Sequence, residues 1–281
     1  MSKIWLITGA SSGLGRIMTE RLLGHGDRVA ATVRRDDALA DLQRKYGESL
    51  SVMRLDLTDL NGIRATVDKA FQRLGRIDVV VSNAAYGLVG AAEELTDAQI
   101  DQQIATNLTG SIQLIRAVLP HLRRQGGGRI VQVSSEGGQV TYPAFSLYHA
   151  TKWGIEGFVE AVAQEVAPFG IDFMIVEPGP TATNFGAGIV MAPLMAAYEH
   201  TPAGAVRHAV KERTFDITGD AARTIDAMIA AADSVKLPRR LPLGSTAYNN
   251  LTRELARRLA EIEAQRDVAF SADRDGVSGI S

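Results

Sequence analysis

Short apolar segments recur along the chain, and each one precedes a longer segment with helical periodicity. These segments are four to six residues long and rich in Val, Ile and Leu, and they cover Ile4–Ile7, Arg28–Val33, Ser51–Leu55, Asp78–Val81, Arg129–Val133 and Asp172–Val176. Continuous apolar runs of this length are typical of strands buried on both faces of a sheet. The pattern therefore predicts strands in a central, covered sheet.

Segments of helical length separate these strands, at residues 14–25, 36–45, 59–74, 97–123 and 147–167. In the last of them, apolar residues return every three or four positions, at Ile155, Phe158, Val159, Val162 and Val166. Strand–helix alternation implies parallel pairing through right-handed crossovers. We therefore expect residues 1–281 to form a single α/β domain, a doubly wound parallel sheet of about seven strands with helices on both faces.

The pattern changes after Val176. Residues 177–219 are rich in Gly, Pro, Ala and Met without a clear period, which predicts a long loop with short helices. Within it, we expect residues 184–219 to act as a substrate loop or lid. Beyond it, the sequence predicts a helix near 220–233, a strand at Arg240–Leu243, a helix over 246–265 and a mobile tail over 266–281.

Composition narrows the possible functions. The 281 residues are 46% hydrophobic, and 30 basic against 32 acidic side chains argue against a general nucleic-acid binder. The absence of cysteine excludes thiolate chemistry, and the five histidines show no metal-ligand spacing, so we expect no metal. No apolar run approaches the roughly 20 residues of a membrane helix, and the segment before Gly9 is too short for a signal peptide. We expect a cytoplasmic protein without membrane or nucleic-acid partners.

Three glycines, Gly9, Gly13 and Gly15, follow the first predicted strand. Where a strand turns into a helix, missing side chains let backbone N–H groups approach a phosphate, and the helix dipole favours the anion. In this position the turn predicts a phosphate-binding loop, although its spacing differs from the common G-x-G-x-x-G fingerprint. The candidate contacts are Gly9, Ser11, Ser12, Gly13, Leu14 and Gly15.

Seven motifs in order resemble the short-chain dehydrogenase/reductase family. They are Thr8-Gly9-x-x-x-Gly13-x-Gly15, Asp56-Leu57-Thr58, Asn83-Ala84-Ala85, Ile104-x-x-Asn107-Leu108-x-Gly110, Ser134-Ser135, Tyr148-x-x-x-Lys152 and Pro178-Gly179-x-x-x-Thr183. The resemblance spans residues 3–183 and implies a Rossmann-type domain that binds a nicotinamide dinucleotide. Ala85 departs from the family's glycine. Residues 83–87 and 178–185 look most like the 17β-hydroxysteroid dehydrogenase-like branch.

The end of the second strand bears on the choice of cofactor. Val33 stands where the family's NAD enzymes usually carry Asp, and Arg34 and Arg35 follow it. A guanidinium can pair with the 2′-phosphate of NADP. We therefore expect NADP(H) rather than NAD(H), held mainly by Arg34, because Ser12 replaces a basic residue that many NADP-dependent relatives carry. The alternative is that both arginines are solvated charges balanced by the two aspartates that follow.

Tyr148 and Lys152 are four residues apart on a predicted helix and share one face. A free tyrosine has a pKa near 10, and a nearby cation favours the phenolate. We therefore expect Lys152, with help from the nicotinamide ring that is cationic in the oxidised cofactor, to lower the pKa of Tyr148 towards neutrality. The resemblance implies that Ser135, rather than Ser134, donates a hydrogen bond to the substrate oxygen. It also implies that Asn107 holds a water linked to Lys152; the alternative for Asn107 is a local helix break.

The resemblance implies further cofactor contacts. They are Asp56 and Leu57 at the adenine, Asn83 and Ala84, Tyr148, Lys152 at the nicotinamide ribose, and Pro178, Gly179, Thr181 and Thr183 near the carboxamide. The expected reaction is hydride transfer between NADP(H) and a carbonyl or secondary alcohol. The candidate pocket residues are mostly apolar, which favours an apolar small molecule: Tyr86, Leu88, Val140, Tyr142, Phe145, Phe185 and Met191.

Two other functions remain open. One is a non-catalytic sensor or scaffold of the same fold that binds nucleotide, although such proteins commonly lose part of the Ser–Tyr–Lys set. The other is an isomerase or dehydratase of a related extended family, against which the chain length and glycine spacing argue. The resemblance also implies a homodimer or homotetramer assembled through the helices over 107–123 and 147–167.

Overall fold

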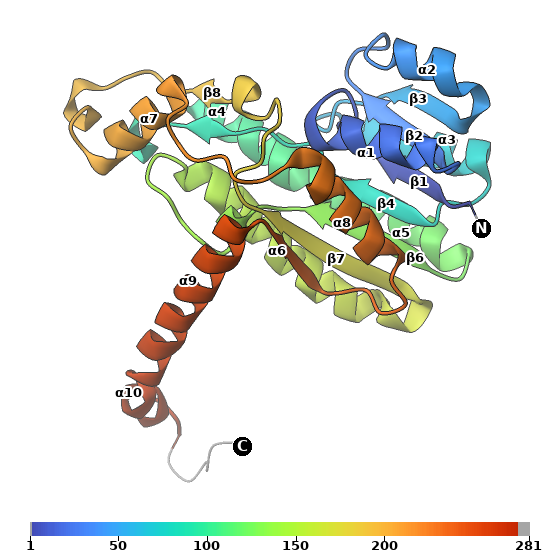
Figure 1. Ribbon diagram of the computed structural model, residues 1–281. Coiled ribbons are helices and arrows are strands. Elements are labelled where there is room, and N and C mark those ends of the chain that lie inside the picture. The colour runs from blue at the N-terminus through green and yellow to red at the C-terminus, as the bar shows by residue number, and fades with distance from the viewer. Residues whose placement is uncertain (1, 275–281) are drawn as a thin grey trace.

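Seven parallel strands form the central sheet in the computed structural model, which describes residues 2–274 (Figure 1). The strands are β1 (Ile4–Ile7), β2 (Arg28–Val33), β3 (Leu50–Arg54), β4 (Val79–Ser82), β6 (Gly128–Val133), β7 (Ile171–Pro178) and β9 (Arg240–Leu243). Their order is β3-β2-β1-β4-β6-β7-β9, so the direction of winding reverses between β1 and β4. This confirms the doubly wound sheet. Open sheets of this kind bind ligands outside the carboxyl ends of the strands at such a reversal.

Helices cover both faces of the sheet (Figure 1). On one face lie α1 (Gly13–Gly24), α2 (Ala40–Tyr46) and α8 (Ala221–Asp233), and on the other lie α3 (Leu60–Leu74), α5 (Gly110–Arg124) and α6 (Ser146–Val166). Successive strand residues point to opposite faces, so in β1 Leu6 joins the core under α3, α5 and α6, whereas Trp5 and Ile7 join the other. The strands are mostly apolar because both faces are covered.

The helix predicted over 97–123 is divided into three parts. It begins as α4 (Asp97–Gln103), continues as the π-helical segment η3 (Ile104–Thr109) and ends as α5. Such π-helical turns are frequent at functional sites. The helix predicted from residue 36 starts only at Ala40, because residues 36–39 form turns. Short 3₁₀ segments lie at Gly47–Ser49, Ala92–Glu94, Glu136–Gly138 (η4), Ala167–Phe169, Gly186–Gly188 and Ala196–Tyr198.

The region predicted as a loop, 177–219, contains more regular structure than expected. β8 (Val190–Met191) pairs in parallel with β5 (Leu88–Val89), and α7 (Pro202–Glu212) follows. The buried side chains of Arg207 and Glu94 form an ion pair that joins α7 to the segment after β5. The segment 184–219, expected to act as a lid, is therefore attached to the body through the β5–β8 pair and through this ion pair.

The last described elements lead away from the sheet. α9 (Ser245–Glu263) projects from the body, and α10 (Arg266–Ser271) lies at its far end (Figure 1). The tail predicted to be mobile over 266–281 thus begins with a short helix. Its residues 275–281 lie outside the described residues, and the mobility itself stays a prediction.

Candidate active site

The glycine-rich turn after β1 is joined directly to the end of β4. Asn83 Nδ2 donates to the carbonyl oxygen of Thr8 at 2.8 Å, and the Asn83 N–H donates to Thr8 Oγ1 at 2.9 Å. Gly9 has a φ of +67°, and a Cβ added there would lie 2.8 Å from Ala84 Cα. The close approach of these two turns at the reversal of the sheet therefore requires glycine at position 9.

The start of α1 forms an open cradle. Ser12 precedes the helix without a side-chain cap, so its first backbone N–H groups are left for other acceptors. At Gly13 (φ +55°) an added Cβ would meet only Thr183 Cβ, at 3.8 Å, whereas at Gly15 it would lie 2.5 Å from the Gly9 carbonyl oxygen. An uncapped helix start beside side-chain-free backbone fits an anionic diphosphate. The residues expected from the sequence thus fit a dinucleotide.

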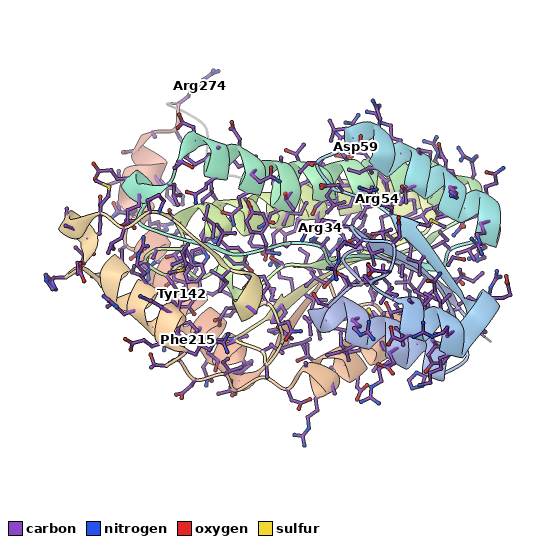
Figure 2. All side chains as sticks on the ribbon, turned by 90° about the horizontal axis from the view of Figure 1, so that it is seen from above. Arg34, Arg54, Asp59, Tyr142, Phe215 and Arg274 are labelled. Carbon is purple, nitrogen blue, oxygen red and sulfur yellow. The ribbon has the colours of Figure 1, made fainter. Side chains whose placement is uncertain are left out.

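Arginine side chains lie at the carboxyl ends of β2 and β3. Exposed Arg34 follows β2, and the register pairs Val33 with Arg54, so the two arginines lie on neighbouring strand ends (Figure 2). Among residues 2–274, Arg34 forms no ion pair, whereas Arg35 lies 3.9 Å from Asp37. Arg54 is a charge that the sequence reasoning missed, because it falls inside a strand pattern.

Asp56 and Leu57 follow β3 at the same edge. Asp56 Oδ1 accepts from the N–H of Thr58 at 2.9 Å and from its hydroxyl at 2.8 Å. The Thr58 N–H, with help from the Arg34 charge, lowers the pKa of Asp56, although partial burial opposes the effect. Leu57 is buried against Gly110 at the start of α5, so only its backbone is available to a ligand.

Ser135, Tyr148 and Lys152 converge beyond the end of β6. Ser135 is half-buried, and its Oγ accepts from the Gly137 N–H at 3.1 Å. The Tyr148 phenol is buried, and the Ser135 hydroxyl beside it acts to lower its pKa. Lys152 Nζ donates to the Val133 carbonyl oxygen at 3.0 Å and lies 5.6 Å from the centre of the Tyr148 ring. The α-helical spacing therefore does place tyrosine and lysine on one buried face, next to the serine at the strand end.

The pKa of Tyr148 moves in the direction opposite to the one expected. Burial, with a smaller effect of the Glu136 charge, raises the pKa of Tyr148 to about 12, although the Ser135 hydroxyl acts to lower it. Burial dominates because the Lys152 ammonium is directed at the Val133 carbonyl rather than at the phenol oxygen. Burial also lowers the pKa of Lys152 to about 8, against the effect of the Glu156 charge. In this chain the phenol carries its proton at neutral pH.

Asn107 lies in the π-helical segment, where its side chain holds the backbone of Tyr86. Its Oδ1 accepts from the Tyr86 N–H at 3.1 Å, and its Nδ2 donates to the Tyr86 carbonyl oxygen at 2.9 Å. A longer contact, 3.5 Å, joins Nδ2 to Thr151 Oγ1, next to Lys152. The buried amide thus connects the segment after β4 to the catalytic helix; the water that the resemblance implies here stays a prediction.

The segment after β7 carries the residues that were predicted to contact the nicotinamide carboxamide. The Gly179 N–H donates to the Leu243 carbonyl oxygen at 3.0 Å, and Thr181 forms a bridge with Gly219. Thr183 Oγ1 accepts from the N–H of Phe185 at 3.2 Å. Because Thr183 lies beside Gly13, the segment from Pro178 comes back to the glycine-rich turn.

Aromatic side chains surround the phenol, and two other predicted pocket residues are buried. The rings of Phe145 and Phe185 have their centres 6.0 and 6.1 Å from that of Tyr148. Leu88 and Val140 are buried: Leu88 belongs to the small β5–β8 sheet, and Val140 packs under the start of α9. Burial does not by itself exclude them, because Tyr148 and Lys152 are buried as well, so their assignment to the pocket stays a prediction.

His149 was predicted to be a surface or packing residue, but it holds the loop between Ser135 and Tyr148. Its Nε2 accepts from the Tyr142 N–H at 2.9 Å, and its Nδ1 lies 2.8 Å from the Gly137 carbonyl oxygen. An acceptor on Nε2 and a donor on Nδ1 require the neutral ring, and burial lowers the pKa of His149 accordingly. In the sequence, the position of His149 next to Tyr148 was the one indication of a role near the site.

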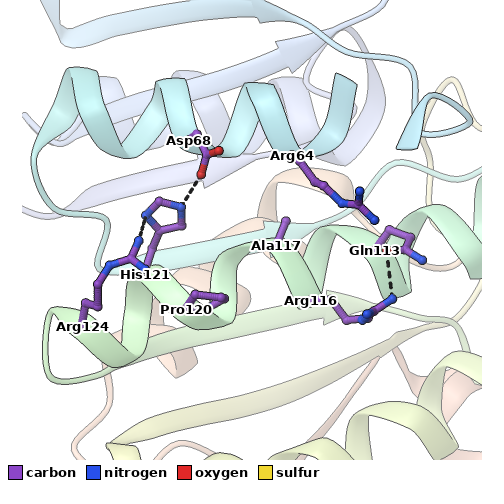
Figure 3. Close-up of a pocket in the computed structure, with 8 residues that line it drawn as sticks. All are labelled: Arg64, Asp68, Gln113, Arg116, Ala117, Pro120, His121 and Arg124. Carbon is purple, nitrogen blue, oxygen red and sulfur yellow. Dashed lines mark hydrogen bonds and ion pairs between the residues drawn. The ribbon is translucent and has the colours of Figure 1, made fainter. Parts of the chain in front are cut away.

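Two grooves of the surface lie away from these residues. One of about 320 Å³ runs between α3 and α5 and is lined by Arg64, Asp68, Gln113, Arg116, Ala117, Pro120, His121 and Arg124 (Figure 3). No group of three or more potential metal ligands occurs within residues 2–274. In the same range, no helix has the length and apolar character needed to cross a membrane.

Comparison with known proteins identifies the relatives of the chain. The family described as short chain dehydrogenase matches residues 3–192. Oxidoreductase BOA17 of Botryotinia fuckeliana is 34% identical over 268 residues, which cover 95% of this chain and 96% of that protein. The crystal structure of a short-chain dehydrogenase from Streptomyces avermitilis is 39% identical, with a TM-score of 0.90 over 97% of this chain and 98% of that one.

A further solved structure contains a nucleotide. The alcohol dehydrogenase of Thermococcus sibiricus, complexed with 5-hydroxy-NADP, is 26% identical, with a TM-score of 0.70 over 86% of this chain and 95% of that one. The similarity therefore extends to a nicotinamide-dinucleotide-binding protein. It does not distinguish the 17β-hydroxysteroid dehydrogenase-like branch from the rest of the family.

Proposed function

Because the chain belongs to the short-chain dehydrogenase family and is an oxidoreductase, we propose that it transfers hydride between NADP(H) and a carbonyl or secondary alcohol of an apolar small molecule. The observation that carries this proposal is the convergence of Ser135, Tyr148 and Lys152 beyond β6, at the same edge as the glycine-rich turn. We also propose membership of the 17β-hydroxysteroid dehydrogenase-like branch, on residues 83–87 and 178–185.

The residues at the carboxyl ends of the strands would each hold one part of the cofactor. When bound, the cofactor supplies the hydride chemistry. The backbone of the turn, with Ser11, Ser12 and Leu14, would hold the diphosphate. Arg34, with Arg54 beside it, would take the 2′-phosphate that NAD lacks. The remaining contacts are Asp56 and Leu57 at the adenine, Asn83 and Ala84 at the ribose side, Lys152 at the nicotinamide ribose, and Pro178, Gly179, Thr181 and Thr183 at the carboxamide.

Within the chain, Tyr148 would act as the general acid in the direction of carbonyl reduction. Its pKa of about 12 leaves the proton in place at neutral pH, and Ser135 would orient the substrate oxygen towards it. The phenolate left after proton transfer is buried, so its charge needs a nearby cation. Lys152 is the buried cation on the same helix face, one turn away. The aromatic rings of Phe145 and Phe185 favour an apolar substrate.

We further propose a homodimer or homotetramer in the cytoplasm. The outer face of α5 and α6 carries a groove of about 460 Å³ with an apolar floor that includes Leu119, Phe158 and Phe169 and a charged rim that includes Arg116 and Glu165. An apolar centre with a charged rim is typical of subunit interfaces. The absence of cysteine is compatible with a reducing compartment.

A substrate panel tests the proposed reaction. Purified protein is incubated with NADPH or NADH and a series of apolar ketones and aldehydes, and oxidation is followed at the absorbance band of the reduced nicotinamide. Turnover with NADPH above that with NADH supports the proposal. Binding of NADPH without turnover of any carbonyl or alcohol would favour the non-catalytic sensor or scaffold instead.

A further inference from the structure

Two buried carboxylates lie beneath the site and take no part in the proposed proton transfer. Glu156 is one helical turn beyond Lys152 on α6 and is 2% exposed, and Glu177 lies on β7 and is 1% exposed. Removing a carboxylate from water is costly unless a cation and hydrogen-bond donors surround it. Glu156 and Glu177 therefore need cations and hydrogen-bond donors around them in order to remain charged.

Arg240, on the edge strand β9, bridges the two carboxylates. Its Nη1 lies 2.6 Å from Glu156 Oε2 and 2.6 Å from Glu177 Oε1, and its Nη2 lies 2.7 Å from Glu160, which is half-exposed. One guanidinium thus faces two buried carboxylates. Arg240 is only partly buried, and the fully buried cation of this region is Lys152.

Glu156 and Lys152 also bind consecutive residues of the same strand end. Glu156 Oε1 accepts a hydrogen bond from the Ser134 hydroxyl, and Lys152 Nζ donates to the Val133 carbonyl oxygen. A Cβ added to Gly138 would lie 1.7 Å from Glu156 Oε1, so the backbone of η4 packs directly on the carboxylate. These contacts hold the backbone on both sides of Ser135.

We propose that Glu156 is a positioning residue that keeps Lys152 in its ammonium form and fixes the strand end carrying Ser135. The inference rests on the proposed function, because it concerns the same site. The titratable groups beside Lys152 are Tyr148 and Glu156, both on α6. Arg240 on β9 and Glu177 on β7 face Glu156 in turn, and Glu136 in η4 acts on Tyr148. Glu156 is the carboxylate that opposes the effect of burial on the pKa of Lys152.

The variant Glu156→Gln removes the charge and keeps the shape and an acceptor for Ser134. We expect the alkaline limb of kcat against pH to move to lower pH by about one unit, a tenfold loss on that limb, with little change in KM. Glu160→Gln is the matched control, since it removes the exposed partner of Arg240 and leaves Glu156 in place; it should keep the wild-type profile. An unshifted profile in Glu156→Gln, or an equal shift in Glu160→Gln, would overturn the proposal.

A nuclear magnetic resonance titration of the Lys152 ammonium, labelled with ¹⁵N, tests the same inference without turnover. Lys152 should titrate at lower pH in Glu156→Gln than in the wild type, even if no substrate is found and the proposed function fails. Should Glu156→Gln not fold, Glu156→Asp takes its place, since it keeps the charge and should leave the titration at the wild-type position. A Lys152 titration that moves to lower pH in Glu156→Asp would contradict the proposal.

Discussion

The side-chain amide of Asn107 pairs with both backbone groups of Tyr86, accepting from its N–H at 3.1 Å and donating to its carbonyl oxygen at 2.9 Å. This double pairing ties the segment after β4 to the π-helical turn that precedes α5. Since Thr151 also touches the amide, the same side chain reaches the catalytic helix next to Lys152.

Loss of this amide should destabilise the fold and slow the reaction. Asn107→Ala leaves the Tyr86 N–H without its partner and leaves the Tyr86 carbonyl oxygen with only the longer hydrogen bond from Gln103 Nε2, at 3.3 Å. We expect a loss of about 1–3 kcal/mol in the free energy of unfolding. Denaturant titration measures this loss. Asn107→Asp replaces the donor by a second oxygen facing the Tyr86 carbonyl and buries a charge, so it should also be less stable than the wild type; equal stability of all three proteins would contradict the assigned role.

Arg34 should distinguish the two nicotinamide cofactors. Replacing it with Ala removes the charge proposed to meet the 2′-phosphate, and a charge-assisted pair is worth roughly 1.5–3 kcal/mol, so the Kd for NADPH should rise about 10- to 100-fold. The Kd for NADH should change little, as measured by fluorescence titration. Arg35→Ala is the control, because Arg35 already lies near Asp37. A similar loss for both cofactors in Arg34→Ala would remove the phosphate role.

Gly9 is required by backbone conformation and by contact. Gly9→Ala combines a φ of +67° with a Cβ 2.8 Å from Ala84 Cα, whereas Gly26→Ala has a φ of +86° and nothing within 4 Å. The positive φ costs both variants roughly 1–2 kcal/mol. Only Gly9→Ala also places its Cβ against Ala84, so it should lose more free energy of unfolding. Chemical denaturation compares the two variants, and an equal loss would show that the contact with Ala84 can relax.

The buried pair of Arg207 and Glu94 should hold the lid in place. Burial acts to raise the pKa of Glu94, but the N–H groups of Met195 and Ala91 together with Arg207 hold it below its ordinary value. The pair therefore contributes stability above the ordinary carboxyl pKa, and this stability is lost as the pH falls through the lowered value.

Arg207→Met leaves the Glu94 charge without its cation, at a cost of about 3–5 kcal/mol. Limited proteolysis between residues 184 and 219 should be faster in this variant at neutral pH. The double variant Arg207→Met with Glu94→Gln leaves no unpaired charge, so it should recover part of the resistance to proteolysis. If the single variant were cleaved at the wild-type rate, this anchor would be unimportant.

The central sheet was predictable because each strand is a continuous apolar run and each covering helix shows a clear period. The lid was not, because β8 pairs through its backbone with β5, about a hundred residues earlier, and two-residue strands leave no periodic signal. The Arg207–Glu94 pair escaped notice because sequence patterns assign charged residues to the surface.

The motifs predicted which residues form the candidate site. They did not predict burial or the directions of pKa changes, which depend on contacts between residues distant in sequence. Leu88 and Val140 were assigned to the pocket from their place after strand ends, and both are buried, which the apolar pattern along the chain does not specify. The direction of the pKa change at Tyr148 followed from burial and from the orientation of Lys152, which spacing along a helix does not specify. Arg240 could not be associated with Glu156 without the pairing of β9 with β7.

The measurement that tests the account most directly is the comparison of Tyr148→Phe with the wild type on a carbonyl substrate found in the panel. The account predicts that Tyr148→Phe binds NADPH with a Kd within about threefold of the wild type, a difference below 1 kcal/mol, and loses turnover. Tyr248→Phe, at an exposed tyrosine of α9, should match the wild type in both. Wild-type turnover in Tyr148→Phe would contradict the claim that this phenol passes the proton.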